Sequence, residues 1–187
     1  MAMGAVFILA ALSLFLWNRQ EDSEAGTSAQ DALAQVIERI EMPDGDSVTD
    51  YPDPYDPEMT VVEIDGYGYI GYLSIPAIGL ELPVMSQWDY DRLKIAPCRY
   101  AGACRSEDLV VCAHNYSRHF GTIRNLANGD KVYFTDMDGV VWQYEVEAVE
   151  ILAPTDIQNM TAGEYALTLF TCTYGGASRV TVRCTRI

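Results

Sequence analysis

The sequence predicts an all-β fold with minor helices, built as a single closed or partly closed β-barrel of roughly eight strands. The chain has 187 residues, of which 49% are hydrophobic, and that is enough for one domain with a proper core. From Tyr67 onward, short apolar runs alternate with Gly, Pro and Asp turn signals, whereas helical periodicity is confined to short segments. The chain has no internal repeat, so one barrel accounts for this pattern.

The expected strands differ in how they are buried. The first alternates apolar and polar positions, as a half-buried strand does, and the segment that ends in "VVCAH" is a continuous apolar run of the fully buried type. Residues 88–95 and 120–126 resemble short helices. The strand segments are 67–76, 80–85, 108–114, 131–136, 140–152, 165–172 and 179–187.

Residues 1–18 are predicted to be a transmembrane anchor or a signal segment. Residues 1–17 contain no charged side chain, and Trp17 stands at the end, where an interfacial aromatic residue belongs. A span needs about 20 apolar residues, so this one is at the short limit, and a cleaved signal peptide is the rival interpretation. Either interpretation places the rest of the chain outside the cytoplasm, so we expect a single-pass protein of the cell membrane with an extracellular domain.

Residues 19–66 are predicted to connect this segment to the barrel, which then fills residues 67–187. A polar tether comes first, and a short amphipathic helix follows over residues 31–41, with apolar residues at helical spacing. The segment that follows is rich in Pro, Asp and Gly, as a linker is.

The charge of the chain excludes one class of partner. With 27 acidic and 12 basic residues, the formal net charge is −15, which repels nucleic acid phosphates and anionic lipid surfaces. Two histidines and scattered acidic residues show no metal-ligand spacing, so we expect no metal or other cofactor, and acidic loops alone do not support a Ca²⁺ site. Of the five cysteines, Cys98 and Cys104 bracket a loop short enough to close as a disulfide in an exported protein.

The candidate chemistry lies at three strand ends. Cys172 follows the apolar run "LTLFT" and precedes a Tyr-Gly-Gly turn, and His114 ends its own buried strand. Arg179 opens the last strand. A thiol becomes a nucleophile only with a basic or cationic neighbour, and strand ends at one rim of a barrel would bring these three side chains together. The alternative from composition is a core cysteine and a hydrogen-bonded surface histidine.

At this point the sequence resembles a family. "LTLFTC", followed by an arginine that opens the last strand, resembles the T-L-x-T-C signature of sortases, the membrane-anchored cysteine transpeptidases of Gram-positive bacteria. "GYIGYLSIPAIGLELPV" resembles their opening strands, and "LVVCAHNYSRHFGTIRNLANGDKVYFTD" resembles the segment with their catalytic histidine. The resemblance implies a closed eight-stranded barrel over most of the chain from about Gly68.

The resemblance also implies a role for each site residue. Cys172 would be the nucleophile, His114 the acid and base, and Arg179 the residue that stabilises the oxyanion and the bound peptide, while His119 would be a bystander. Arg183 has the same strand parity as Arg179 and is its rival. The substrate-binding residues would be Thr171, Asn115 and Tyr174.

The implied substrates are proteins with an LPxTG-like sorting signal. The acceptor would be the amine of a lipid-linked cell-wall precursor or a pilin lysine, reached through a Cys thioester. Two other functions stay open: a secreted cysteine hydrolase that uses the same Cys and His, and a non-catalytic anchored β-barrel that binds a partner. Transfer to an added amine distinguishes a transpeptidase from the hydrolase, and reactivity of the Cys172 thiol distinguishes it from the binding protein.

The class within the family stays open between class B-like, pilin-type class C-like and class D-like members. Ala113 stands where the family usually has Gly, and the segment between Cys172 and Arg179 is shorter than usual. In pilin-polymerising sortases, an Asp-Pro-aromatic segment before the first strand covers the cleft. Asp53 and Tyr55 stand in a comparable place, so they would form a lid, although a plain Pro/Asp linker is the alternative.

Overall fold

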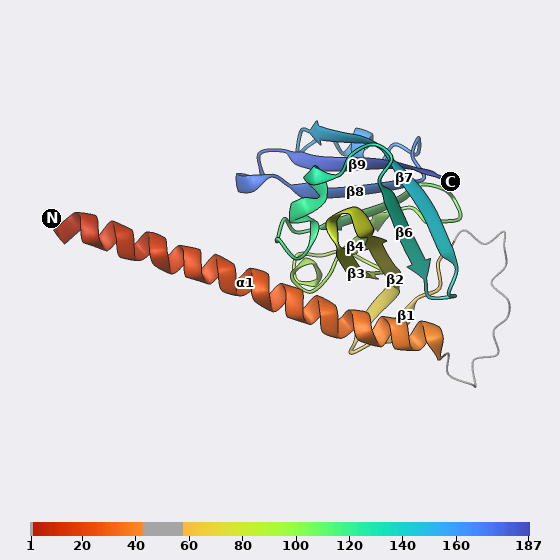
Figure 1. The fold of residues 1–187 in the computed structure, drawn as a ribbon, viewed down its shortest axis with the longest axis horizontal. Coiled ribbons are helices and arrows are strands. Elements are labelled where there is room, and N and C mark those ends of the chain that lie inside the picture. Colours follow the sequence, from red (N-terminus) through yellow and green to blue (C-terminus); the bar gives the residue numbers. More distant parts are fainter. Residues whose placement is uncertain (1, 43–57) are drawn as a thin grey trace.

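A computed structural model describes residues 2–42 and 58–187 of the chain (Figure 1). Asp53 and Tyr55, the predicted lid residues, lie outside this part. The helices are α1 (Ala2–Glu41) and α2 (Ile157–Met160), and the short 3₁₀ helices are η1 (Pro76–Ile78), η2 (Arg92–Lys94), η3 (Phe120–Asn125) and η4 (Tyr174–Gly176). The strands are β1 (Val62–Ile64), β2 (Tyr67–Ile75), β3 (Leu80–Met85), β4 (Cys98–Ala101), β5 (Leu109–Ala113), β6 (Lys131–Asp136), β7 (Val141–Leu152), β8 (Leu167–Cys172) and β9 (Arg179–Arg186).

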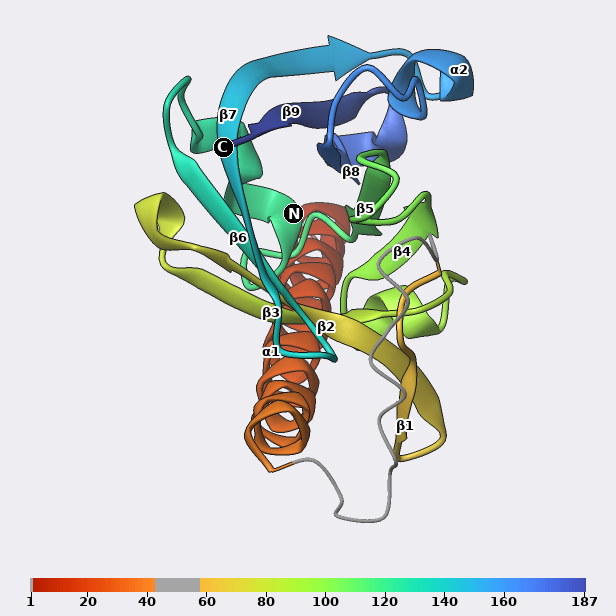
Figure 2. The ribbon, with the colours of Figure 1, turned by 90° about the vertical axis from the view of Figure 1, so that its right-hand side faces the viewer.

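Eight of these strands form a closed barrel, as the sequence predicts. Neighbouring strands pair in the order β1-β2-β3-β4-β5-β8-β9-β7-β6, and β2 also pairs with β6, which closes the ring from β2 to β6. Strand β1 pairs only with β2, so it lies outside the ring as a short extension. Closure leaves the eight barrel strands without a free edge. Figure 2 shows the ring from a second side, with β5 and β8 next to each other.

Strands β5 and β8 of the barrel wall are buried on both faces, but against different partners. The inward-facing residues fill the barrel with a large apolar cluster that includes Leu73, Val111, Leu169 and Val182. On the outer face a second apolar cluster lies over β2 to β5 and β8, and side chains of α1, η2 and α2 complete it. Burial on both faces explains why β5 and β8 are continuous apolar runs rather than alternating ones.

Helix α1 replaces the predicted tether and separate short helix with one continuous element of 40 residues. The second half of the helix lies against β1, β2 and β3, while the N-terminal half extends away from the barrel (Figure 1). Small and apolar residues at helical spacing make this contact, among them Ala25, Ala29, Leu33 and Val36, each of them buried. Tertiary contacts thus hold residues 19–30 in a helix that their polarity did not indicate.

The N-terminal half of α1 exposes a run of apolar side chains between Val6 and Trp17. Within the described part of the chain, no helix combines the length and the apolar character that crossing a membrane requires.

The predicted disulfide between Cys98 and Cys104 is absent, since both residues are free thiols. The strand register explains why: Cys98 faces the outer cluster and pairs across β4 and β5 with Cys112, whereas Cys104 belongs to the barrel interior. Burial raises the pKa of the Cys98 and Cys104 thiols to about 12, so they are protonated at neutral pH.

Candidate active site

The strand register brings the three predicted catalytic residues to one level of the barrel. Strands β5 and β8 are parallel, and their last paired residues are Ala113 and Thr171, so His114 and Cys172 each stand one residue beyond that pair. On the other side of β8, Cys172 is paired directly with Arg179 of β9. Paired residues of neighbouring strands project to the same face. The register therefore brings His114, Cys172 and Arg179 to the same rim of the barrel.

One hydrogen bond ties the two strand ends together. The buried Thr171 side chain donates from Oγ1 to the Ala113 carbonyl oxygen at 2.8 Å. Since these two residues directly precede Cys172 and His114, the bond fixes the spacing of the thiol and the imidazole. The Thr171 hydroxyl predicted to orient substrate is thus engaged with the protein itself.

The turn after Cys172 is a closed structure that returns the chain at once to β9. Thr173 and Ser178 exchange backbone and side-chain hydrogen bonds, among them Thr173 N–H to the Ser178 carbonyl at 2.9 Å. Gly175 and Gly176 have φ angles of 76° and 72°, which favour glycine. The Tyr-Gly-Gly sequence thus makes a turn short enough to place Arg179 beside Cys172 and leaves the Tyr174 side chain 84% exposed.

The segment after His114 packs between the barrel rim and α1. Asp22 of α1 accepts hydrogen bonds from the backbone N–H of Ser117, at 2.7 Å, and from its hydroxyl. Residue 121 must be glycine here, because a Cβ atom would lie 2.6 Å from the Tyr116 carbonyl oxygen. Residues 114–121, called the histidine loop below, are therefore held from both sides.

The two histidines have different surroundings. His114 is half-buried at the rim, and its ring centroid lies 5.0 Å from that of Tyr116. Desolvation, helped by the positive charge of Lys94, lowers its pKa, although Glu21 opposes the shift. His119 is fully buried against α1, where Nε2 lies 3.4 Å from the Ala25 carbonyl oxygen. His119 thus belongs to the packing between the loop and α1, away from the thiol.

Two hollows of about 160 Å³ each meet at Cys172 and Thr171. The first, called the apolar groove below, runs over the outer face of β5 and β8 between an aromatic wall and α2. Trp88, Tyr100 and Phe170 form the wall. The ring centroid of Tyr100 lies 5.3 Å from that of Trp88 and 5.2 Å from that of Phe170. Its other lining residues are Tyr90, Leu93, Cys112, Ala113, His114, Pro154, Ile157, Met160 and Arg179.

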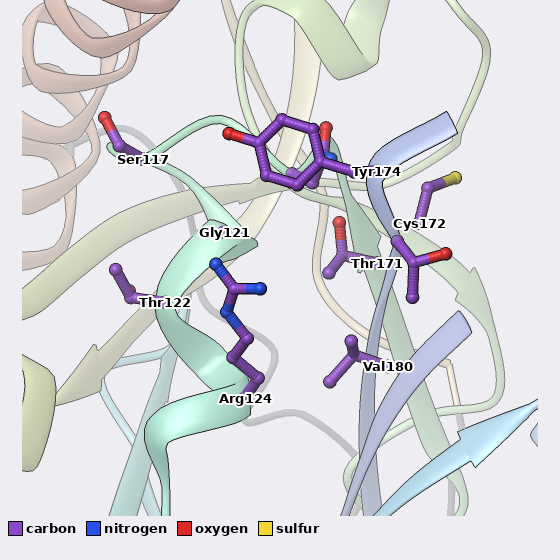
Figure 3. Close-up of a pocket in the computed structure, with 10 residues that line it drawn as sticks. Ser117, Gly121, Thr122, Arg124, Thr171, Cys172, Tyr174 and Val180 are labelled. Carbon is purple, nitrogen blue, oxygen red and sulfur yellow. The ribbon is translucent and has the colours of Figure 1, made fainter. Parts of the chain in front are cut away.

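The second, called the polar hollow below, lies on the other side of β8, toward η3 (Figure 3). Six of its ten lining residues carry a hydroxyl or amide group, among them Asn115 and Tyr174, both predicted from the sequence to bind substrate. Ser117, Gly121, Thr122, Arg124, Thr173 and Val180 complete the lining. Sequence reasoning missed the wall of the groove and Arg124, because η3 is brought to Cys172 by the fold alone.

Among the residues that the structure describes, no group of three or more His, Cys, Asp or Glu side chains is placed to hold a metal ion. The chemistry that the site offers is that of a thiol with a basic and a cationic neighbour.

Comparisons with known proteins concern the family and the fold. Residues 73–187 match the profile of the Sortase domain. Sortase A of Bacillus anthracis is 29% identical over 121 residues, which cover 62% of this chain and 57% of that protein, so the chain spans little more than half the length of this relative.

Solved structures show the same fold. A sortase C1 structure from Streptococcus suis has a TM-score of 0.55 and 26% identity, covering 64% of this chain and 73% of that one. A Clostridium perfringens structure, described as a sortase D5 transpeptidase, has a TM-score of 0.64 and covers 86% of this chain and 99% of its own. At 17% identity the latter likeness concerns the fold alone.

Proposed function

The chain belongs to the sortase family, and from this membership we propose that it is a cysteine transpeptidase acting on proteins with an LPxTG-like sorting signal. It forms a thioester on Cys172 and transfers the bound protein to the amine of a lipid-linked cell-wall precursor or of a pilin lysine. The observation that carries the proposal is the register of β5, β8 and β9, which sets His114, Cys172 and Arg179 side by side.

The protonation state of His114 supports the first step. Its lowered pKa leaves the imidazole neutral at pH 7, so it accepts the thiol proton as Sγ attacks the scissile carbonyl. The C–N bond then breaks, the leaving amine takes that proton from His114, and the thioester remains. In the second step the incoming amine gives a proton to His114 as it attacks, and the sulfur leaves with a proton.

Arg179 is suited to the charge that develops on the carbonyl oxygen. Its NH1 donates to the Gly176 and Ser178 carbonyl oxygens, each at 3.2 Å. Within the described part of the chain, no acceptor takes a hydrogen bond from the other nitrogens of this guanidinium. Nε and Nη2 therefore stay available to donate to the oxyanion and a neighbouring peptide carbonyl.

The apolar groove is suited to the donor peptide. It leads to Cys172 past Phe170 and Met160, and an extended peptide with Leu and Pro side chains would bury apolar surface there. We assign the sorting signal to this groove.

The exposed apolar run from Val6 to Trp17 is suited to attach the enzyme to the cell membrane, with the barrel outside the cell. The first charged residue, Arg19, follows directly after this run. Fractionation of cells that produce the full chain and a variant lacking residues 2–17 tests this: we expect the full chain with the membrane and the shortened one outside it.

The activity is tested with a panel of LPxTG-like peptides and an added amine. We expect cleavage with a new amide between the donor fragment and the amine, detected by mass spectrometry. Cleavage that yields only the free acid at every amine concentration would identify a hydrolase instead. Absence of any cleavage by a protein whose Cys172 does not react with a thiol reagent would favour a binding module.

A further inference from the structure

Cys172 lies between two hollows of different chemistry, and the proposed function uses only one of them. The apolar groove takes the donor peptide, while the polar hollow reaches the same Cys172 and Thr171 from the η3 side. Transpeptidation needs two substrates at one sulfur. The second substrate must reach the thioester while the donor still occupies the groove, so it has to come from another side.

The lining of the polar hollow suits a hydrophilic second substrate. Asn115 and Thr122 offer an amide and a hydroxyl group, which bind a peptide backbone rather than an apolar chain. Asn115 lines this hollow and directly follows His114, whose own side chain lines the apolar groove. An amine that enters here therefore approaches Cys172 from the η3 side, next to the segment that carries the base.

Arg124 adds a charge to this hollow. It is exposed at the end of η3, and Figure 3 shows its guanidinium directed into the space between Gly121 and Thr171. In the described part of the chain, this arginine makes neither a hydrogen bond nor an ion pair, although acidic residues outnumber basic ones by 27 to 12. A guanidinium left without a carboxylate in so acidic a protein is available for a carboxylate of a ligand.

We propose that the polar hollow is the acceptor site and that Arg124 pairs with a carboxylate of the amine acceptor. The inference rests on the proposed function and names the chemistry of its second substrate: a short peptide with a free amine at one end and a carboxylate at the other. The Cys172 sulfur points away from Arg124 (Figure 3), so the amine and the carboxylate are separated by several backbone atoms. A phosphate group is disfavoured, because the net charge of −15 opposes a multiply charged ligand more than a single carboxylate.

The transfer step balances without further reactants. The amine nitrogen attacks the thioester carbonyl and gives a proton to His114, the C–S bond breaks, and the sulfur recovers the proton from His114. The products are a new amide and free Cys172. Arg124 touches only the far end of the acceptor, so it affects which amine binds rather than the bond that forms.

The test uses the full chain, a cleavable LPxTG-like peptide, and two acceptors that differ only in charge: triglycine and triglycine amide. For each enzyme we compare kcat/KM for the two acceptors, so any general effect of a substitution cancels. The wild type should prefer triglycine. In Arg124→Gln the ratio of triglycine to its amide should fall about two- to fivefold, as expected for one exposed charge pair.

Arg19→Gln is the matched control, because it removes the same charge from an exposed position on α1 outside the hollow. It should keep the wild-type ratio. An unchanged ratio in Arg124→Gln, or an equal fall in both variants, overturns the proposal while cleavage and amide formation still support the proposed function. A preference for O-phosphoethanolamine over triglycine would overturn the carboxylate assignment. If peptide is cleaved without any amide product, the proposed function itself fails.

Discussion

The outer face of β8 and β9 carries an arginine at each end, and the two have opposite surroundings. Arg183 is 3% exposed, and its guanidinium contacts the Met160 carbonyl, the Thr168 hydroxyl and the Glu150 carboxylate. Arg179, four residues earlier, is half-buried beside Cys172 and donates only to carbonyl oxygens of its own turn. Strand parity allows either arginine to be the catalytic one, but their hydrogen-bond partners differ. The end of the face at Arg183 is closed by packing, and the end at Arg179, called the open end below, is accessible to substrate.

The largest effect on activity should follow from removing the Cys172 thiol at the open end. Cys172→Ala should abolish cleavage of LPxTG-like peptides, because Cys172 is the residue that stands level with His114 and directly opposite Arg179. The matched control is Cys184→Ala in the barrel interior, which should keep cleavage activity and lose about 1 kcal/mol of unfolding free energy. Peptide cleavage assays and urea unfolding measure the two effects. Retained cleavage in Cys172→Ala would refute the whole site.

His114→Ala should reduce the rate of cleavage by about 10²- to 10⁴-fold, the usual contribution of a general acid and base. Its half-buried position at the open end predicts little change in stability. Single-turnover formation of the thioester, followed by mass spectrometry, reports the step directly. A rate within a few-fold of the wild type would remove His114 from the mechanism.

The two arginines themselves give the next prediction. Arg179→Lys should reduce kcat/KM about 10- to 100-fold although charge is kept, because a lysine lacks the planar fork of donors. Arg183→Lys should keep the activity of the folded enzyme but lower the free energy of unfolding by about 2 to 4 kcal/mol, since several buried hydrogen bonds are lost. Activity assays combined with thermal unfolding separate the two outcomes, and the reverse ranking would move the catalytic role to Arg183.

The open end could be predicted because it depends on local patterns. "DLVVCAH" and "LTLFTC" are buried runs that each end in a chemical group, and buried neighbouring strands meet at one rim. The resemblance to sortases supplied the proposed roles that composition alone left open. Thr171 was predicted to contact substrate, yet its hydroxyl bonds to Ala113, a contact between residues 58 positions apart that no local pattern reveals.

The contacts of α1 could not be predicted either, because they also join residues that are far apart in the sequence. Asp22 and Ser117 are 95 residues apart, and the polar residues between Trp17 and Asp31 hid the helix that joins them. The buried residues Ala25, Ala29, Leu33 and Val36 recur every three or four positions, and that spacing was the available signal. The prediction of a disulfide between Cys98 and Cys104 was wrong because it relied on their short separation in the sequence. The sheet register sets Cys98 opposite Cys112 instead.

The burial of His119 near the open end predicts that the free energy of unfolding of the protein depends on pH. Burial against α1 is the main cause that lowers its pKa from 6.5 to about 4, and the nearby His114 adds to this, while the Ala25 carbonyl and Asp22 oppose it. The unfolded chain therefore binds a proton at a higher pH than the folded one, so stability is complete above about pH 6.5 and falls as the pH falls toward 4. Between pH 7 and 4.5 this histidine should cost on the order of 2 to 3 kcal/mol. His119→Gln should lose that much less in urea unfolding over this range, and equal losses in both proteins would contradict the burial of a neutral ring.

The smallest expected effect concerns the support of the histidine loop by α1. Asp22→Ala removes the carboxylate that accepts two hydrogen bonds from Ser117, and these partly exposed bonds contribute about 1 kcal/mol. The loop begins at His114, so a less ordered loop should lower kcat a few-fold and leave KM for the donor peptide nearly unchanged, since the apolar groove is otherwise untouched. The matched control is Glu24→Ala, two residues further along α1, whose carboxylate bonds only within the helix to Gln20. If both variants have the same kcat and the same unfolding midpoint, α1 merely covers the barrel; a lower kcat in Asp22→Ala alone makes it a positioning element of the open end.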